Sequence, residues 1–320
     1  MKSYKIFIFV FLVSWLNACS FFGGDDDGAI VQPIAPETGQ MMMDYMPEEG
    51  VEPSRRQIQL NLPSAIAEPM WIQNAALPKF SNSKSRPKIV IVIDDLGIVQ
   101  DNAWRAASLP GPITMAYLPY AHNLRDMTAA AHANGHELMV HMPMQPLNDA
   151  ADPGPNALTV GLKPAELKRR IQANLNAFDH YVGVNNHMGS RFTQEQAGLE
   201  VLMAELQKRD VLYLDSRTSA TSVAEPTARR FNVATTGRDI FLDHVISKEF
   251  IEGALKRTED HAKKHGSAIA IGHPHDLTLD ALEKWLPTLK RKGFDLVPIT
   301  AVMTERDVRI QGITSSAFSH

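Results

Sequence analysis

Carboxylate and imidazole side chains in this chain stand at the ends of short apolar runs. The residues that follow such runs are Asp94, Asp95, His141, Asp215, His273 and His275. Carboxylates and imidazoles are typical zinc ligands in hydrolases, and both groups transfer protons in catalysis. If the ends of these runs meet in space, the residue types predict a metal-centred hydrolytic site.

Parallel strands would bring these residues together. The predicted strands are 88–93, 113–117, 137–141, 182–185, 211–215, 268–272 and 294–298. Predicted helices alternate with them, at 122–134, 163–178, 194–209, 247–265 and 276–292. Short apolar runs that alternate with helices are typical of buried parallel strands, whose carboxyl ends open onto the active site. We expect an α/β fold in which about seven parallel strands form a closed or nearly closed sheet.

The adjacent pair Asp94 and Asp95 is the strongest of these signals. Two carboxylates that follow a buried strand lose hydration and repel each other, so something must compensate their charge. A divalent cation would do so, with one carboxylate as its ligand and the other free to handle a proton. The alternative is that Asp95 caps a helix while Asp94 points to solvent.

Two histidines complete the preferred ligand set with Asp95. His141 ends a predicted strand, and His187 lies in the polar stretch 183–190 after another. Catalytic zinc takes three protein ligands and keeps one position open, and it lowers the pKa of water to about 7. We therefore predict a divalent metal, zinc first, although such sites accept several ions. Alternatively, the asparagines beside His187 only cap turns.

Five segments together resemble the divergent polysaccharide deacetylase family, a branch of the chitooligosaccharide deacetylase-type fold. In chain order they are Ile93–Gly97, His141–Met144, Asn185–Ser190, Leu214–Thr218 and Ile271–His275. The resemblance covers roughly residues 87–305. It implies an irregular (β/α) barrel and metal-dependent removal of N-acetyl or related acyl groups from a glycan.

The resemblance also implies roles for individual residues. Asp94 corresponds to the base and Asp95 to the aspartate that binds the metal. His273 corresponds to the histidine that protonates the leaving amine, and Asp215 to the acidic residue that would orient His273 or Arg217. The remaining candidates for supporting these groups or contacting substrate are Asn186, Ser216, Arg217, Asp243 and His275.

The chain departs from the family pattern at two positions. Where the family has a second metal histidine four residues after the first, this chain has Gln145, so His187 would replace that ligand. The arginine usual in the third motif has only Arg191 as a stand-in. An inactive carbohydrate-binding or cell-wall regulatory protein therefore remains an alternative. So do a different metal hydrolase and a glycosidase that uses Asp94 and Asp215 as its carboxylate pair.

The N-terminus predicts export. Lys2 and Lys5 precede the apolar stretch 6–16, which is short for a membrane span but suits a signal sequence. Cys19, the sole cysteine, follows in a segment that resembles the lipobox of bacterial lipoproteins. The resemblance implies lipidation of Cys19 and a membrane anchor on the periplasmic side of the envelope. An ordinary signal or an uncleaved anchor is the alternative.

Composition divides the chain into four parts. Residues 1–19 form the predicted signal, 20–86 a flexible tether rich in proline and aspartate with a possible packing arm, 87–306 the barrel, and 307–320 a tail. With a net charge of −4 and no basic tract, the chain gives no reason to expect nucleic acid. The predicted partners are an envelope glycan and, through Cys19, the membrane.

Overall fold

The predicted site depends on parallel strands whose carboxyl-terminal ends lie together. The computed structural model describes residues 68–76 and 86–306. The strands in this part are β1 Lys88–Leu96, β2 Thr114–Tyr117, β3 Glu137–Met144, β4 Tyr181–Met188, β5 Leu212–Asp215, β6 Thr235–Gly237, β7 Ile240–Phe241, β8 Ser267–Gly272 and β9 Asp295–Leu296. Their order is β6-β5-β4-β3-β2-β1-β8-β7, with β9 paired to β1, and every pairing is parallel. The predicted α/β barrel-like fold is confirmed.

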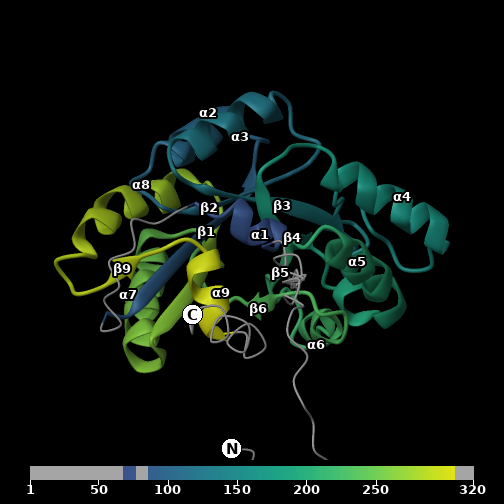
Figure 1. The fold of residues 1–320 in the computed structure, drawn as a ribbon. Helices are drawn as coiled ribbons and strands as arrows, with labels where there is room; N and C mark the ends of the chain where they lie inside the picture. The colour runs from purple at the N-terminus through teal and green to yellow at the C-terminus, as the bar shows by residue number, and fades with distance from the viewer. Residues whose placement is uncertain (1–67, 77–85, 307–320) are drawn as a thin grey trace, which may run out of the picture. The chain divides into compact units, whose positions relative to one another are not determined.

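Helices cover the outer face of the sheet (Figure 1). They are α2 Gln100–Ala107, α3 Leu124–Ala133, α4 Pro164–Leu175, α5 Gln196–Lys208, α6 Ala224–Arg230, α7 Lys248–His265 and α8 Asp276–Trp285, with short helices α1 Met70–Gln73 and α9 Thr300–Arg306 and 3-10 turns at Phe192–Gln194 and Leu286–Thr288. The sequence did not predict α2, α6, β6 or β7, because segments this short carry little periodicity. Within the described ranges, no helix is both long and apolar enough to cross a bilayer.

Two residues join the opposite edges of the sheet. Strands β6 and β7 end the strand order, yet only Arg238 and Asp239 separate them in the chain. The Arg238 N–H donates to the Asp215 carbonyl (2.9 Å), and the Asp239 N–H donates to the Ile269 carbonyl (2.9 Å). The barrel is therefore closed here by the chain itself, and the strand ends surround one opening.

Side-chain alternation along the strands divides the core into two clusters. On β1, Val90 and Val92 belong to an inner cluster inside the barrel, whereas Ile89, Ile91 and Ile93 pack towards the helices. Burial of each such side chain contributes about 1.5–3 kcal/mol. Because the strand period is two, the residue two places beyond the last inner one also faces the interior. These residues are Asp94 after Val92, His141 after Met139, Ser216 after Leu214 and His273 after Ile271.

The amino ends of the strands are closed by α1 and α9. Trp71 of α1 is 5% exposed and belongs to the inner cluster. The buried Glu137 carboxylate accepts hydrogen bonds from the N–H groups of Ala76 (3.3 Å) and Thr300 (3.2 Å), and from the Thr300 hydroxyl. Burial raises the pKa of Glu137 to about 7, although the bonds from Thr300 lower it. The buried contacts at this end of the barrel therefore stabilise the fold.

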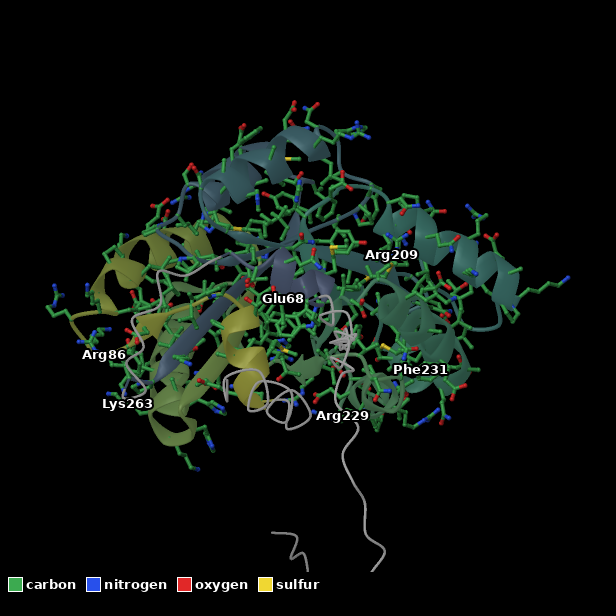
Figure 2. The ribbon with its side chains drawn as sticks, in the orientation of Figure 1. Glu68, Arg86, Arg209, Arg229, Phe231 and Lys263 are labelled. Carbon is green, nitrogen blue, oxygen red and sulfur yellow. The ribbon has the colours of Figure 1, made fainter. Side chains whose placement is uncertain are left out.

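A cavity of about 860 Å³ lies at the same amino ends, beside the first residues of β1 and β8. Its lining includes Arg86 and Lys263, which Figure 2 labels at the edge of the body near α7. Two of its cations are paired with acids that also line it, Lys88 with Glu305 and Arg306 with Asp239. None of the predicted site residues lines this cavity.

The predictions for residues 1–67, 77–85 and 307–320, including Cys19, lie outside the described residues.

Candidate metal centre and active site

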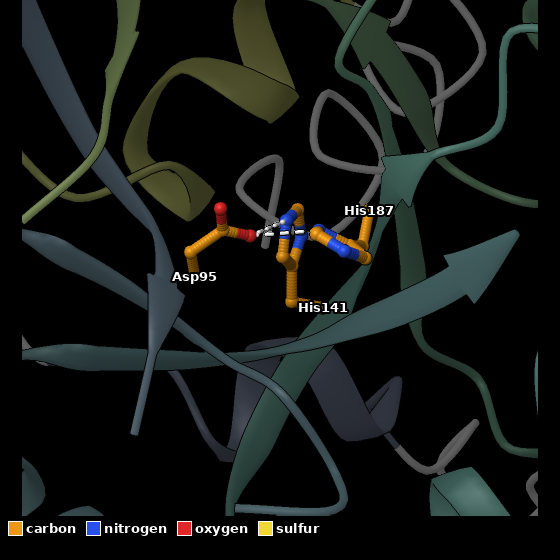
Figure 3. Close-up of side chains that lie close together, drawn as sticks. All are labelled: Asp95, His141 and His187. Carbon is orange, nitrogen blue, oxygen red and sulfur yellow. Dashed lines mark ion pairs between the residues drawn. The ribbon is translucent and has the colours of Figure 1, made fainter. Parts of the chain in front are cut away.

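The three predicted metal ligands come together at the ends of β1, β3 and β4. Asp95 Oδ1 lies 2.7 Å from His187 Nδ1 and 3.1 Å from His141 Nε2 (Figure 3). Each residue offers one ligand atom within 4.8 Å of the others. His141 is 2% exposed, while the Asp95 side chain retains 35% exposure. The group is therefore buried on the His141 side and exposed to solvent on the Asp95 side, where a substrate could approach.

A left-handed turn at Asp95 lets two adjacent carboxylates serve one site. Alternation points Asp94 into the barrel, so an extended Asp95 would point away. Asp95 instead adopts φ 57°, and the pairing register of β1 with β2 shifts between Ile93 and Leu96. This conformation is uncommon for aspartate, and such strain is frequent at functional sites. The turn brings the Asp95 carboxylate over the strand ends, beside the two histidines.

The hydrogen bonds of Asn185 define which atom of His141 faces Asp95. The Asn185 amide N–H group donates to Asp94 Oδ1 (2.7 Å), so its carbonyl oxygen accepts from His141 Nδ1 (2.9 Å). His141 Nε2 then presents a lone pair to Asp95 Oδ1, and this buried oxygen makes no well-directed hydrogen bond with any described residue. Two lone pairs facing each other at 3.1 Å repel unless a cation lies between them. Two nitrogens and one carboxylate oxygen form the donor set that zinc prefers.

In the absence of a metal ion, protons bound to the histidines would supply the positive charge that the metal ion otherwise provides. Burial raises the pKa of Asp95, but the nearby imidazoles of His141 and His187 outweigh burial and hold that pKa below its ordinary value. Burial lowers the pKa of His141, but Asp94 and Asp95 raise it above its ordinary value overall. The apo site therefore binds a proton on His141 that a metal must displace, which makes metal affinity fall at low pH.

Asp94 has the properties of a general base. It is 2% exposed, and its Oδ2 lies 3.8 Å from His141 Nε2, next to the ligand group. Burial raises the pKa of Asp94, and the opposing charges of His141 and His273 offset this only in part. A carboxylate with a raised pKa accepts a proton more readily than an ordinary one.

His273 stands on the other side of the group as a proton donor. Its Nε2 lies 3.8 Å from Asp95 Oδ2, and its Nδ1 contacts Asp243 Oδ1 (3.0 Å). Burial lowers the pKa of His273, but the hydrogen bond and charge of Asp243 raise it to about 9. At neutral pH the ring is therefore protonated, with Nε2–H directed towards the site.

Asp243 orients His273 through three hydrogen bonds that its carboxylate accepts. Its Oδ2 accepts from the His273 N–H (2.6 Å) and the Thr278 hydroxyl (2.9 Å), while Oδ1 accepts from the ring. Asp243, His273 and His275 also lie close enough together to hold a metal. Because the Asp243 oxygens already have these donors, we assign this second group to holding His273. His275 itself begins α8 as its N-cap residue.

The structure distinguishes between the two roles expected for Asp215, which were to orient His273 or to orient Arg217. This residue follows Leu214 on β5, whose side chain is inner, so alternation turns Asp215 outwards. Its carboxylate accepts from the Ser222 hydroxyl (2.7 Å) and the Arg217 N–H (2.7 Å). Asp243, rather than Asp215, orients His273, and Asp215 shapes the turn after β5 instead. A glycosidase pair of Asp94 and Asp215 is disfavoured for the same reason.

The other predicted supporting residues hold the loops after β4 and β5. Asn186 Oδ1 accepts from the Ser216 N–H (2.9 Å), and the Ser216 hydroxyl accepts from Asn185 (3.2 Å). The Arg217 guanidinium pairs with Glu225 (2.7 Å), on the rim of the opening. These contacts fix the walls of the site.

Sequence reasoning did not assign Asn185 or Arg238. Arg238, in the two-residue closure of the barrel, donates to the carbonyls of Ser216 (2.7 Å) and Arg217 (3.0 Å), and its charge acts on Asp94. Arg191, the expected stand-in for the family arginine, pairs with Asp149 (3.0 Å) instead. The charged pair Arg238-Asp239 directly before the short apolar run 240–242 is the signal that could have identified Arg238.

Gln145 has a structural role in place of a metal-binding one. Its side-chain carbonyl accepts from the Val160 N–H (2.9 Å), and its backbone carbonyl accepts from Arg191 N–H (3.0 Å) and Phe192 N–H (3.1 Å). Gln145 thus ties together the loops after β3 and β4. His187, which pairs with Pro143 in the β3–β4 register, lies beside Asp95 and His141 instead.

Comparison with known proteins agrees with this architecture. A family profile described as divergent polysaccharide deacetylase matches residues 91–303. The chain is 33% identical over 234 residues to the uncharacterized protein YibQ of Escherichia coli, which covers 73% of each chain. It is 35% identical over 228 residues to an uncharacterized protein of Haemophilus influenzae, which covers 71% of this chain and 80% of that one.

A solved structure shares the fold. The crystal structure of an uncharacterized protein from Agrobacterium tumefaciens is 26% identical and superposes with a TM-score of 0.71, over 75% of this chain and 97% of that one. The residues matched by the family profile include Asp94, Asp95, His141, His187 and His273. The chain therefore belongs to the divergent polysaccharide deacetylase family.

Proposed function

We propose that this protein is a metal-dependent hydrolase that removes N-acetyl or related acyl groups from the amino sugars of an envelope glycan. One observation carries the proposal: Asp95, His141 and His187 converge on one point, with Asp94 and His273 beside them. A base, an acid and a three-ligand metal group are what amide hydrolysis at a sugar requires. The family supplies the sugar as the substrate class.

Each residue has a defined task in this reaction. A divalent cation, zinc first, held by the three ligands would polarise the amide carbonyl and acidify water. Asp94 takes the proton from the attacking water. Protonated His273 donates a proton to the leaving amine nitrogen, and Asp243 keeps the ring oriented and stabilises its positive charge. Asn185 hydrogen-bonds both Asp94 and His141, so it fixes the position of the base relative to this ligand.

Metal analysis of the purified full-length chain tests the ligand set. We expect about one zinc ion per chain, the stoichiometry of a three-ligand site. The variants Asp95→Ala and His141→Ala should lose it. His132→Ala is the matched control, because this exposed histidine only stacks on His180 (5.1 Å between ring centroids). Normal zinc content in both ligand variants would refute the assignment.

Acetate release from a panel of N-acetylated glycans tests catalysis. Asp94→Asn and His273→Ala should retain metal yet lose roughly 10²–10⁴-fold in turnover, the usual contribution of a general base or acid. A wild-type chain that binds zinc but releases no acetate from any glycan would favour the inactive binding protein over the enzyme.

We also propose that the protein is a lipoprotein of the bacterial envelope, anchored through Cys19 on the periplasmic side. The support is the N-terminal pattern of basic residues, a short apolar stretch and a single cysteine. The variant Cys19→Ala should fail to incorporate labelled fatty acid and should leave the membrane fraction. Unchanged partitioning of this variant would contradict the anchor.

A further inference from the structure

A second group of metal-ligating side chains lies beside the proposed zinc ligands. Asp243, His273 and His275 each offer one ligand atom within 4.8 Å of the others. Asp243 follows β7, and the two histidines follow β8, which pairs with β7 in the sheet. Among the described residues, no third group of this kind is present. We call these three residues the second group.

The imidazole of His275 has no task in the proposed reaction. It is partly exposed, its ring centroid lies 5.8 Å from that of His273, and it makes no hydrogen bond with any described residue. The residue is the N-cap of α8, but its side chain makes no capping bond. A ring nitrogen without a hydrogen-bond partner keeps its lone pair available for a cation.

The contact between His273 and Asp243 has nearly the spacing of two zinc ligands. Nδ1 lies 3.0 Å from Oδ1, and two ligands of one tetrahedral zinc ion lie roughly 3.3 Å apart. Oδ1 accepts a hydrogen bond only from this ring, while Oδ2 accepts from the His273 N–H and the Thr278 hydroxyl. A zinc ion between Nδ1 and Oδ1 would therefore displace one proton and keep the two bonds that hold the carboxylate in place.

The proposed zinc ligands should bind an ion before the second group does. Asp95 Oδ1 makes no well-directed hydrogen bond, so a cation there displaces no donor from it. A cation in the second group must displace the ring proton that Asp243 accepts. Asp95 Oδ2 lies 3.8 Å from His273 Nε2, so an ion already bound to Asp95 would also repel a second one nearby. The second ion should therefore bind only when zinc is in excess.

A cation on His273 would remove the proton donor of the proposed reaction. The protonated ring carries one proton on each nitrogen. Zinc at Nδ1 would release that proton to solvent and take its place on the ring. The Nε2–H that remains would belong to a neutral, metal-bound imidazole, which is a much weaker acid than an imidazolium and a poor donor to a leaving amine.

We propose that the second group is an inhibitory zinc site, which binds a second ion when zinc is in excess and stops acyl hydrolysis. This inference rests on the proposed function, because it concerns regulation of the same site. Two imidazoles and a carboxylate are a donor set that suits zinc. The His273 side chain retains 23% exposure, so an ion can reach it from solvent. While only the first ion is bound, the group holds His273 in place.

Zinc titration of the full-length chain tests the inference. Equilibrium dialysis measures the zinc bound per chain, and acetate release from an N-acetylated glycan is measured over the same range of free zinc. The rate should rise as the first ion binds. It should then fall by roughly 10²–10⁴-fold as the second ion binds, which is the usual contribution of a general acid.

The variant His275→Ser removes one ligand and suits the start of α8, because serine is a favoured N-cap residue. It should bind one weakly held zinc ion fewer than the wild type. Half-inhibition, relative to its own rate with one equivalent of zinc, should need at least about tenfold more free zinc, or about 1.4 kcal/mol. His244→Ser is the matched control, because this exposed histidine adjoins Asp243 but does not belong to the group. It should be inhibited like the wild type.

The outcomes separate this inference from the function on which it rests. Acetate release that stays constant in excess zinc, or that falls equally in His275→Ser and the wild type, would overturn the inhibitory site and leave the hydrolase standing. A rate that rises as the second ion binds would also overturn it, since that ion would assist the reaction. Loss of one zinc ion in His275→Ser, without acetate release from any glycan at any zinc concentration, would overturn the hydrolase and support the second group as a metal site.

Discussion

Replacing Asn185 with alanine tests whether one buried amide couples the base to a metal ligand. Asn185 is fully buried at the end of β4, where it donates to Asp94 Oδ1 (2.7 Å) and accepts from His141 Nδ1 (2.9 Å). Alanine removes both bonds, and with them the donation to the Ser216 hydroxyl (3.2 Å). The His141 ring then loses the acceptor that sets its tautomer and orientation, and Asp94 loses a donor.

The size of the effect follows from these two contacts. A buried polar group left without its partner costs about 1–3 kcal/mol. Partners that orient metal-binding histidines are worth 10–100-fold in metal affinity, or about 1.4–2.8 kcal/mol. We therefore expect Asn185→Ala to fold, with a lowered free energy of unfolding, and to bind zinc about 10–100-fold more weakly than the wild type.

Competition with a chromophoric chelator measures zinc affinity, and urea unfolding of the apo protein measures stability. Asn174→Ala is the matched control: Asn174 is also buried, and its side chain bonds the Asn156 carbonyl (3.1 Å) and the Met142 sulfur (3.1 Å) without bonding any of the three ligand side chains or Asp94. It should lower stability and leave zinc affinity within about twofold of the wild type. If Asn185→Ala and Asn174→Ala showed equal zinc affinities, the proposed coupling would be disproved.

Two further predictions concern pH. Burial raises the pKa of Glu137 from 4.5 to about 7, so between these values the folded protein keeps a proton that the unfolded chain has released. The free energy of unfolding should therefore fall by roughly 3 kcal/mol as pH rises through this range. Urea titrations at pH 4.5 to 8 measure this fall, and the variant Glu137→Gln should not show it. An identical fall in the variant would disprove the assignment. In the variant Asp243→Asn, the carboxylate that raises the pKa of His273 is absent, so burial lowers this pKa. The basic limb of the pH profile of kcat/KM should therefore move to lower pH. A basic limb at the same pH as in the wild type would contradict the role of Asp243.

The alternation of side chains explains why much of the site could be predicted. Apolar runs marked the main strands, and the period of two carried Asp94, His141 and His273 onto the inner face where those strands end. Parallel strands place their carboxyl ends at one opening, so convergence followed from the fold class. The prediction that His141 and His187 lie together followed from these two properties.

Alternation broke down where the backbone leaves the regular strand. Asp95 reaches the site through a left-handed turn at φ 57°, a conformation that aspartate tolerates better than most residues but that the strand pattern does not place at this position. Arg238 acts near Asp94 because two residues cross from one sheet edge to the other, and β6 and β7 beside it are too short to show a pattern.

Residue types and spacing by themselves determined the fold class and the strand-end cluster of carboxylates and imidazoles, because strand period and parallel topology are local properties that repeat along the chain. Only the tertiary structure decided that Asp243 rather than Asp215 holds His273. Both aspartates follow strands and look equivalent in sequence, but their strands lie in different parts of the barrel and turn them to different neighbours. Which of two similar carboxylates meets a given imidazole depends on long-range packing, which brings residues 30 positions apart into contact.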